Sequence, residues 1–196
     1  DLALVRSGMI TVDSYLELLG RTITRVQRGA GRRRQSIGAS SFDASTKFYK
    51  QDANATNAIV IYYAKGSLVA LCLELKLRNE TSDRVSLDDV MKAAWARWGE
   101  SGEGMPEDGF EKLCMEVSDV DLQDFFDATV RGTGELPLES LLHSHGVDYV
   151  LRRSSGAADK GGKPSGETSL PAGGLGATRG PRAGTAVFLA GDKEGP

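Results

Sequence analysis

The sequence is poor in residues that would mark several common classes of protein. Among 196 residues it has two cysteines, Cys72 and Cys114, and no Cys-x-x-Cys. Two cysteines are too few for a disulfide scaffold, so we interpret them as small buried apolar residues. The two histidines, His143 and His145, stand in no His-Glu-x-x-His sequence. Their two-residue spacing does not suit a metal site on one helix face, so we expect structural or exposed roles for them.

Long apolar runs and an initial methionine are also absent. The longest apolar runs, Ala58–Ala64 and Leu68–Leu73, have seven and six residues. A membrane span needs about 20, so we expect no membrane partner. The chain begins with Asp1 rather than Met, and we therefore expect it to be a piece of a longer protein. The lack of a signal peptide then leaves the compartment, cytoplasmic or periplasmic, undecided.

The net charge of −3 hides an uneven distribution of charged residues. Residues 1–50 carry a net charge of +5, residues 51–150 carry −11, and residues 151–196 carry +3. An acidic chain is a poor candidate for general nucleic-acid binding, which depends on neutralising phosphates. The first stretch contains a basic patch of six arginines: Arg21, Arg25, Arg28, Arg32, Arg33 and Arg34. It suits a solvated face with a turn, or a surface that docks onto acidic residues such as the middle stretch.

Apolar spacing predicts a mainly α fold over residues 1–153. Helices are expected at residues 2–6, after Thr11, over 57–78, after the capping box Ser86-Leu87-Asp88-Asp89, after Pro106, from Asp121 to Gly132, and over 137–144. Residues 40–49 are ambiguous, with helix favoured, and residues 147–151 alternate like a strand. The helix over 57–78 is apolar on nearly all sides, which indicates a buried central position.

The composition changes after residue 153. Residues 154–196 hold eleven glycines, four of the six prolines and a single aromatic residue, Phe188. Residues 154–174 are typical of a flexible linker, which we expect to be mobile. Residues 185–190 form one plausible strand, and one strand cannot bury a core. We therefore expect residues 175–196 to be the truncated start of another domain.

The segment Tyr63-Ala64-Lys65-Gly66 is the strongest candidate for chemistry. A tyrosine in a helix is usually a core residue, but its hydroxyl can also serve a metal or a base. Adjacent Tyr62 and Tyr63 should point about 100° apart, so at most one should face a given cleft. Lys65, two residues along, should not touch the Tyr63 hydroxyl. Gly66 suggests close approach by another element, or open space beside the ring.

This segment resembles the Tyr-x-Lys-Gly of the gluzincin aminopeptidases, and is most similar to the glycyl-aminopeptidase family, whose members end in a PDZ domain. The resemblance covers about residues 1–153 and depends on the order and spacing of several motifs. Besides Tyr63–Gly66 these are Leu2–Ile10, Gln35–Ile37, Ser41–Ala44, Lys47–Tyr49, Ser86–Met91, Asp124–Asp127 and Gly132–Pro137.

The resemblance implies a zinc metallopeptidase that hydrolyses N-terminal peptide bonds with zinc-activated water. In that family two His of His-Glu-x-x-His and a later Glu hold the zinc, and all would lie upstream of residue 1. This chain would then be the helical C-terminal half of the catalytic domain (residues 1–153), a linker (154–174) and the start of a PDZ-like domain (175–196). Tyr63 would be a catalytic residue that donates a hydrogen bond to the oxyanion. Alone, the chain is expected to be inactive and without bound zinc.

A second interpretation belongs to another class of protein. The chain could be a non-catalytic helical interaction module that docks through the arginine patch or through the acidic middle stretch. The residues encoded before Asp1 distinguish the two interpretations, because a His-Glu-x-x-His followed by a Glu supports the peptidase. The sequence leaves the preferred N-terminal residue of a peptide substrate and the oligomeric state undecided.

Overall fold

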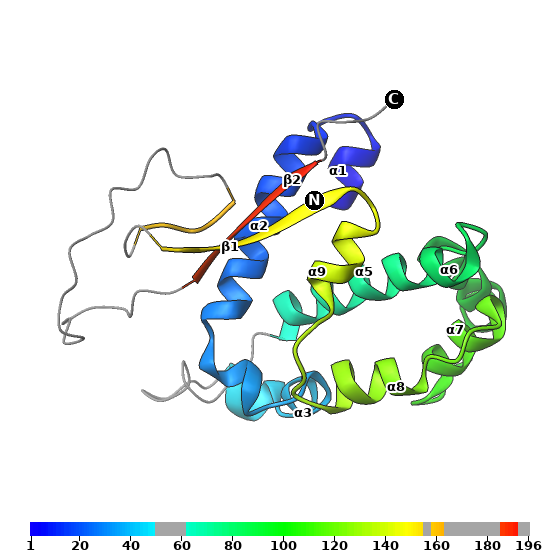
Figure 1. Cartoon of the computed structure of the whole chain (residues 1–196). Helices are drawn as coiled ribbons and strands as arrows, with labels where there is room; N and C mark the ends of the chain where they lie inside the picture. Colours follow the sequence, from blue (N-terminus) through cyan, green and yellow to red (C-terminus); the bar gives the residue numbers. More distant parts are fainter. Residues whose placement is uncertain (50–61, 155–157, 163–184, 192–196) are drawn as a thin grey trace, which may run out of the picture.

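The chain is mainly helical, as predicted (Figure 1). A computed structural model describes residues 1–49, 62–154, 158–162 and 185–191. Within these ranges the helices surround α5 (Tyr62–Thr81), and the second of two paired strands lies along α2 (Val12–Arg28). No helix in the described ranges is both long and apolar enough to cross a bilayer.

The chain begins with α1 (Leu2–Arg6) and α2, at the positions that the sequence predicts. Thr11 starts α2, because its Oγ1 accepts a hydrogen bond from the backbone N–H of Ser14 at 3.2 Å. This bond satisfies one of the amide groups that a helix leaves unpaired at its start. The apolar stripe of α2 faces the core through its four buried hydrophobic residues, Leu16, Leu19, Ile23 and Val26.

A short turn η1 (Ala30–Arg33) leads from α2 into α3 (Ile37–Phe42) and the π-helical turn η2 (Ala44–Phe48). The favoured helical interpretation of residues 40–49 is therefore confirmed for most of that stretch. The Tyr49 backbone N–H closes η2 by donating to the Ala44 carbonyl at 3.0 Å. Tyr49 is the last described residue before segment 50–61.

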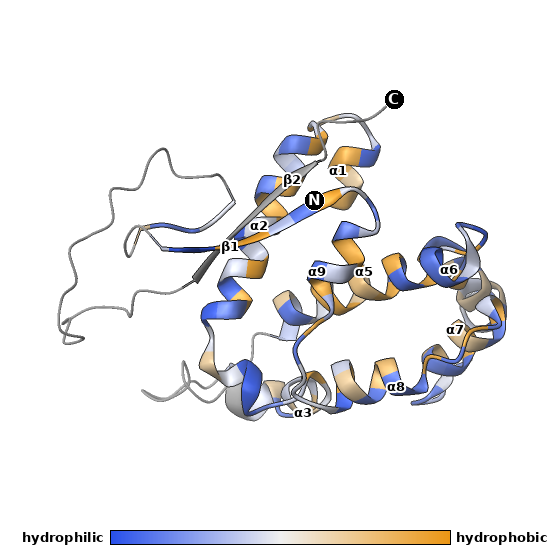
Figure 2. Cartoon of the chain, viewed as in Figure 1, coloured by the Kyte–Doolittle hydropathy of each residue, from blue (hydrophilic) through white to orange (hydrophobic). Residues whose placement is uncertain are grey.

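Helix α5 is the central element that the sequence predicts. One side of it enters the core through Leu68, Val69, Cys72, Leu73 and Leu77. It lies against α2, α3, α6 and α9, which explains why so many of its residues are apolar (Figure 2). The predicted start at residues 57–61 lies outside the described residues.

The next helices are α6 (Leu87–Ala94) and α7 (Gly109–Ser118), separated by the π-helical turn η3 (Trp95–Gly99). Helix α6 begins at the predicted capping box, where the Ser86 backbone N–H donates to the Asp89 carboxylate at 2.9 Å. The predicted start of α7 is likewise confirmed.

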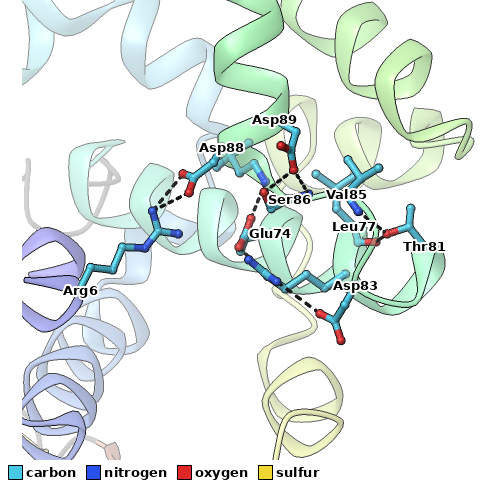
Figure 3. A network of polar contacts seen from close by, with 11 residues as sticks. Arg6, Glu74, Leu77, Thr81, Asp83, Val85, Ser86, Asp88 and Asp89 are labelled. Atoms are coloured by element: carbon cyan, nitrogen blue, oxygen red, sulfur yellow. Dashed lines mark hydrogen bonds and ion pairs between the residues drawn. The ribbon is translucent and has the colours of Figure 1, made fainter.

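Polar contacts connect α1, α5 and α6 (Figure 3). The Glu74 carboxylate of α5 accepts the backbone N–H of Leu87 at 2.5 Å and Nε of Arg78 at 2.7 Å. Arg6 of α1 pairs with Asp88 of α6 at 2.8 Å. The carboxylate of Glu74 thus satisfies an amide at the start of α6 and fixes the angle between the two helices.

The chain then forms α8 (Gln123–Phe126), the π-helical turn η4 (Asp127–Arg131) and α9 (Leu138–His143). Figure 1 shows α7 and α8 on the side of α5 that faces away from the strands, with α6 beyond the end of α5. The helices predicted at 121–132 and 137–144 are confirmed, except that the first ends in π-helical form. Their buried side chains complete the core: Leu122, Phe125, Phe126, Leu138, Leu141 and Leu142.

The two strands, β1 (Val147–Arg153) and β2 (Thr185–Gly191), form an antiparallel pair in which Tyr149 lies opposite Leu189. Both strands appear where the sequence predicts them, although their pairing was not predicted. It joins the end of the predicted catalytic stretch to the predicted start of another domain, and β2 also lies along α2.

The described part of the predicted linker also contacts α2. Arg28 donates to the Ser154 hydroxyl at 3.0 Å. Gly162, with φ of +91°, comes so close to the chain of α2 that an added Cβ would lie 2.6 Å from the Glu17 carbonyl. Residues 155–157 and 163–174 lie outside the described residues, as do 175–184 and 192–196. The division into domain, linker and PDZ-like start remains a prediction.

Candidate active site at the start of α5

Three tyrosines gather where η2 ends and α5 begins. The Tyr49 hydroxyl lies 3.2 Å from the Tyr63 hydroxyl and 3.3 Å from the Tyr62 hydroxyl. The rings of Tyr62 and Tyr63 are tilted by 32° with centroids 4.2 Å apart. Tyr63 is 63 % exposed and Tyr49 is 64 % exposed. The candidate catalytic phenol therefore stands on an open surface and is not a core residue.

The arrangement corrects the expectation that Tyr62 and Tyr63 face different directions. Both hydroxyls meet at Tyr49, even though adjacent helical residues leave the axis about 100° apart. The physical reason is that each phenol is long, so the two hydroxyls can meet although the two side chains leave the helix in different directions.

The hydrogen bonds shift the acidity of two of these phenols in opposite directions. The pKa of Tyr63 is lowered, chiefly by its bond to Tyr49 and then by Tyr62. The pKa of Tyr62 is raised, first by its bond to Tyr49 and then by Tyr63. An oxygen that accepts hydrogen bonds ionises more easily, and a hydroxyl that donates one ionises less easily. Tyr63 is accordingly the more acidic phenol of the pair.

Lys65 faces the opposite way from Tyr63 and is buried. Its side chain is 2 % exposed, and its ammonium donates to the Arg32 carbonyl of η1 at 3.5 Å. This confirms that Lys65 does not contact the Tyr63 hydroxyl. Burial lowers the pKa of Lys65, while Glu135 raises it and Arg32 lowers it further. The lysine anchors the first turn of α5 against η1, and so fixes the base of the tyrosine cluster.

An ion pair lies beside this buried ammonium. Arg32 contacts Glu135 at 3.0 Å, and Arg33 contacts the same carboxylate at 3.3 Å. Nε of Arg32 is buried and has no hydrogen-bond partner among the described residues. A narrow cavity of about 10 Å³, which has room for about one water molecule, is lined by Arg32, Lys65 and Glu135. These charges hold η1 against the turn that precedes α9.

Gly66 lies beside open space. A Cβ built on it would meet nothing within 4 Å. Of the two alternatives, the structure supports open space beside Tyr63 and not close approach by another described element.

The histidines and the other candidate sites give weaker evidence of a functional site. His145 Nδ1 lies 2.8 Å from the Leu141 carbonyl, and His143 lies exposed at the end of α9. Within the described ranges no three His, Cys, Asp or Glu side chains are grouped so as to hold a metal ion. A mainly apolar cavity of about 330 Å³ lies between α1, α2, α5 and α6 and does not include the tyrosine cluster.

Much of the predicted arginine patch is paired inside the chain. Arg21 pairs with Glu17 along α2, Arg28 bonds Ser154, and Arg32 and Arg33 share Glu135. Glu135 belongs to the acidic middle stretch, so part of the patch docks onto that stretch within this chain. These arginines therefore give little support to an external docking surface.

Sequence reasoning placed Tyr63 but gave no role to Tyr49. Tyr49 stood only within the motif Lys47–Tyr49, and no helical or strand period connects it to Tyr63 across residues 50–61. The pairing of Arg32 with Glu135 was not predicted either, because the two residues are far apart in the sequence and no local pattern connects them.

Comparisons with known proteins agree with this picture. Residues 1–69 match the family model of the M61 glycyl aminopeptidases. The chain is also similar to the crystal structure of an aminopeptidase N family protein from Idiomarina loihiensis, with 40% sequence identity and a TM-score of 0.79. That similarity covers 83% of this chain and 28% of the other, so this chain spans little more than a quarter of that protein's length. No curated protein matches the chain.

The mainly helical fold, which exposes Tyr63, is therefore similar to the fold of part of an aminopeptidase N family protein. More particularly, its first 69 residues match the M61 glycyl aminopeptidases, so the resemblance predicted from the sequence is confirmed. The matched stretch, residues 1–69, includes the whole Tyr63–Gly66 segment.

Proposed function

We propose that this chain is part of a metallopeptidase of the aminopeptidase type, and that Tyr63 stabilises the transition state of peptide hydrolysis. The observation that supports this most is the exposure of Tyr63 within a stretch that matches the glycyl aminopeptidases. Lys65 supports the same conclusion, because its burial fixes the turn from which Tyr63 projects.

The chemistry suits a phenol. When water attacks the scissile carbonyl carbon, the C=O electron pair moves onto oxygen and makes an oxyanion. The Tyr63 hydroxyl donates a hydrogen bond to this oxygen, and the bond strengthens as negative charge develops. As the C–N bond breaks, the C=O bond re-forms, the water's OH stays on the carbonyl carbon, and the amine leaves with the other proton of that water. Tyr63 keeps its own proton throughout, so it must be neutral to act.

The resemblance also implies zinc, which in such an enzyme activates the attacking water. The described residues do not fit that metal, since they contain no suitable group of three ligands. We therefore propose that the ligands come from outside this chain and that residues 1–153 contribute the phenol and part of the cleft wall. The linker and the PDZ-like start belong to the same proposal, with a peptide as substrate.

Replacing Tyr63 by Phe in the longer parent enzyme tests the proposal. The change removes the hydroxyl and keeps the ring, so zinc content and stability should hardly change. We expect kcat to fall by about 100- to 1,000-fold, the usual loss for one oxyanion donor. KM should change much less, because the bond forms mainly in the transition state.

A matched control is Tyr15→Phe, which removes a half-buried phenol on α2, away from the tyrosine cluster. It should leave kcat unchanged within a factor of about two. If the Tyr63→Phe enzyme retained full turnover, the catalytic assignment would be wrong and the segment would be ordinary helix surface.

A further inference from the structure

Tyr49 is placed to control the direction of the Tyr63 hydroxyl. We propose that Tyr49 is a positioning residue, which donates its proton to Tyr63 Oη and accepts the proton of Tyr62. The three phenols would then form a hydrogen-bonded chain, Tyr62 to Tyr49 to Tyr63, that ends on the substrate oxyanion. The inference rests on the proposed function of Tyr63 and extends it to a second residue.

The number of phenol protons sets the donor and acceptor of each hydrogen bond among the three tyrosines. Each phenol has one proton to donate and can accept hydrogen bonds on the same oxygen. Tyr49 Oη lies within hydrogen-bond distance of both other hydroxyls, at 3.2 and 3.3 Å. If Tyr63 donated to Tyr49, its only proton would be used and none would remain for the oxyanion. Tyr63 must therefore accept from Tyr49, and Tyr49 can then accept from Tyr62.

The pKa shifts of Tyr62 and Tyr63 agree with donation from Tyr62 to Tyr49 and from Tyr49 to Tyr63. The lowered pKa of Tyr63 is that of an accepting phenol, and the raised pKa of Tyr62 is that of a donating phenol. Hydrogen bonds in a chain polarise one another, so each strengthens the next. A Tyr63 hydroxyl that accepts from Tyr49 is consequently a better donor to a developing negative charge.

Both sides of the cluster are fixed by contacts in other parts of the fold. Tyr49 follows η2, and its backbone N–H is bonded to Ala44 at 3.0 Å. Tyr62 and Tyr63 belong to the first turn of α5, which the buried Lys65 connects to η1. The rings of Tyr62 and Tyr63 also contact each other, with centroids 4.2 Å apart. The three hydroxyls therefore meet because two separate elements deliver them to one point.

The first test uses this chain alone and needs no catalysis. Tyrosine labelled with ¹³C at Cζ gives one NMR signal for each of the five tyrosines, and each signal shifts when its phenol ionises. Loss of a signal in single Tyr→Phe variants assigns Tyr62 and Tyr63. In the unchanged chain Tyr63 should ionise at lower pH than Tyr15 or Tyr149, whose pKa values burial raises.

In Tyr49→Phe the ionisation of Tyr63 should move to higher pH and that of Tyr62 to lower pH. Tyr15→Phe should move neither. Tyr49 is 64 % exposed, so its replacement by Phe should leave the packing intact, which circular dichroism can check. Unchanged ionisation of Tyr63 in Tyr49→Phe would overturn the inference and would leave the proposed function of Tyr63 standing.

The second test uses the parent enzyme and a double-mutant comparison. Tyr49→Phe should lower kcat about 3- to 10-fold with little change in KM, which is the effect of one lost hydrogen bond. In an enzyme that already carries Tyr63→Phe, the same change should have no further effect, because Tyr49 acts through the missing hydroxyl. A loss of equal size in both backgrounds would show a merely structural role and would contradict the inference. If Tyr63→Phe itself had no effect, the proposed function would fail instead.

Discussion

Tyr63 and Lys65 are two residues apart and lie in opposite environments. The phenol is 63 % exposed, whereas the ammonium is 2 % exposed. A buried ammonium is costly unless it is paired, and here its partners are a carbonyl oxygen and the nearby Glu135. The cost is offset by the contact between α5 and η1, which sets the position of the tyrosine cluster.

The burial of Lys65 should make stability depend on pH. Because burial lowers its pKa in the folded chain, the unfolded chain keeps this proton over a pH range in which the folded chain has lost it. Stability rises with pH wherever the unfolded state holds more protons. The contribution of Lys65 to the free energy of unfolding should therefore increase as the pH rises towards the ordinary lysine pKa, and stay constant below the folded pKa.

Urea unfolding of the chain and of Lys65→Met at several pH values measures this contribution. The stability of Lys65→Met relative to the unchanged chain should be greatest near neutral pH and should fall in alkaline solution, where the unchanged chain gains stability. Lys92→Met is the control, since its side chain is 78 % exposed and carries no burial cost. If the difference in free energy of unfolding between Lys65→Met and the unchanged chain did not depend on pH, the Lys65 ammonium would not be buried in solution.

At the scale of single residues, the sequence could identify Tyr63 because its motif occupies four consecutive positions. It could not identify Tyr49, Arg32 or Glu135, since their contacts depend on how η1, η2 and the turn before α9 are brought together. Nor could it place the Tyr62 hydroxyl, because helical geometry alone ignores how two long side chains lean toward each other.

The helices as elements were largely predictable. Thr11 and the Ser86–Asp89 box start the helices that apolar spacing requires, and both are found where expected. The π-helical turns η2, η3 and η4 were not predicted, because their apolar residues follow nearly the same spacing as in an α-helix. The contact of Gly162 with α2 also escaped prediction, since a glycine-rich composition gives no sign of where the chain lies.

Within α5, Gly66 provides a test of what the open space is for. A Cβ at this position would meet nothing, so Gly66→Ala should stabilise the chain by up to about 1 kcal/mol through its higher helix propensity. Gly132→Ala is the contrasting control, because its Cβ would lie 2.9 Å from two backbone carbonyl oxygens and should destabilise the chain. Thermal unfolding of both variants measures the effects.

The same Gly66→Ala change can be introduced into the parent enzyme. A fall in activity in spite of higher stability would indicate that the substrate, or another part of the parent, fills the space beside Tyr63. Loss of stability in this chain, on the other hand, would show that Gly66 is not in an ordinary helical conformation.

At the scale of the whole molecule, contacts between distant parts of the chain combine opposite charges and pair the two strands. Arg6–Asp88 and Arg32–Glu135 pair the basic first 50 residues with the acidic middle stretch, so the uneven charge distribution is partly satisfied inside the chain. The pairing of β1 with β2 could not be predicted, because a strand's partner depends on the whole fold. It brings residues on both sides of the predicted linker together, although the domain division itself stays a prediction.

The chain by itself should show neither the metal content nor the activity of the proposed parent enzyme. If the metal ligands lie outside it, this chain should hold no stoichiometric zinc after dialysis and should not hydrolyse peptide substrates. Metal analysis by mass spectrometry, combined with an aminopeptidase assay, measures both. One tightly held zinc per chain would mean that its own residues form a metal site, and the proposed division of labour would be wrong.

The central claim is that Tyr63 binds the oxyanion, and a transition-state analogue tests it most directly. A phosphinic pseudo-peptide carries a tetrahedral phosphorus with a negatively charged oxygen, whereas a peptide product does not. In the parent enzyme, Tyr63→Phe should weaken binding of the phosphinic compound by about 100-fold or more and leave product binding nearly unchanged. Equal affinity of the unchanged and Tyr63→Phe enzymes for the phosphinic compound would contradict the account.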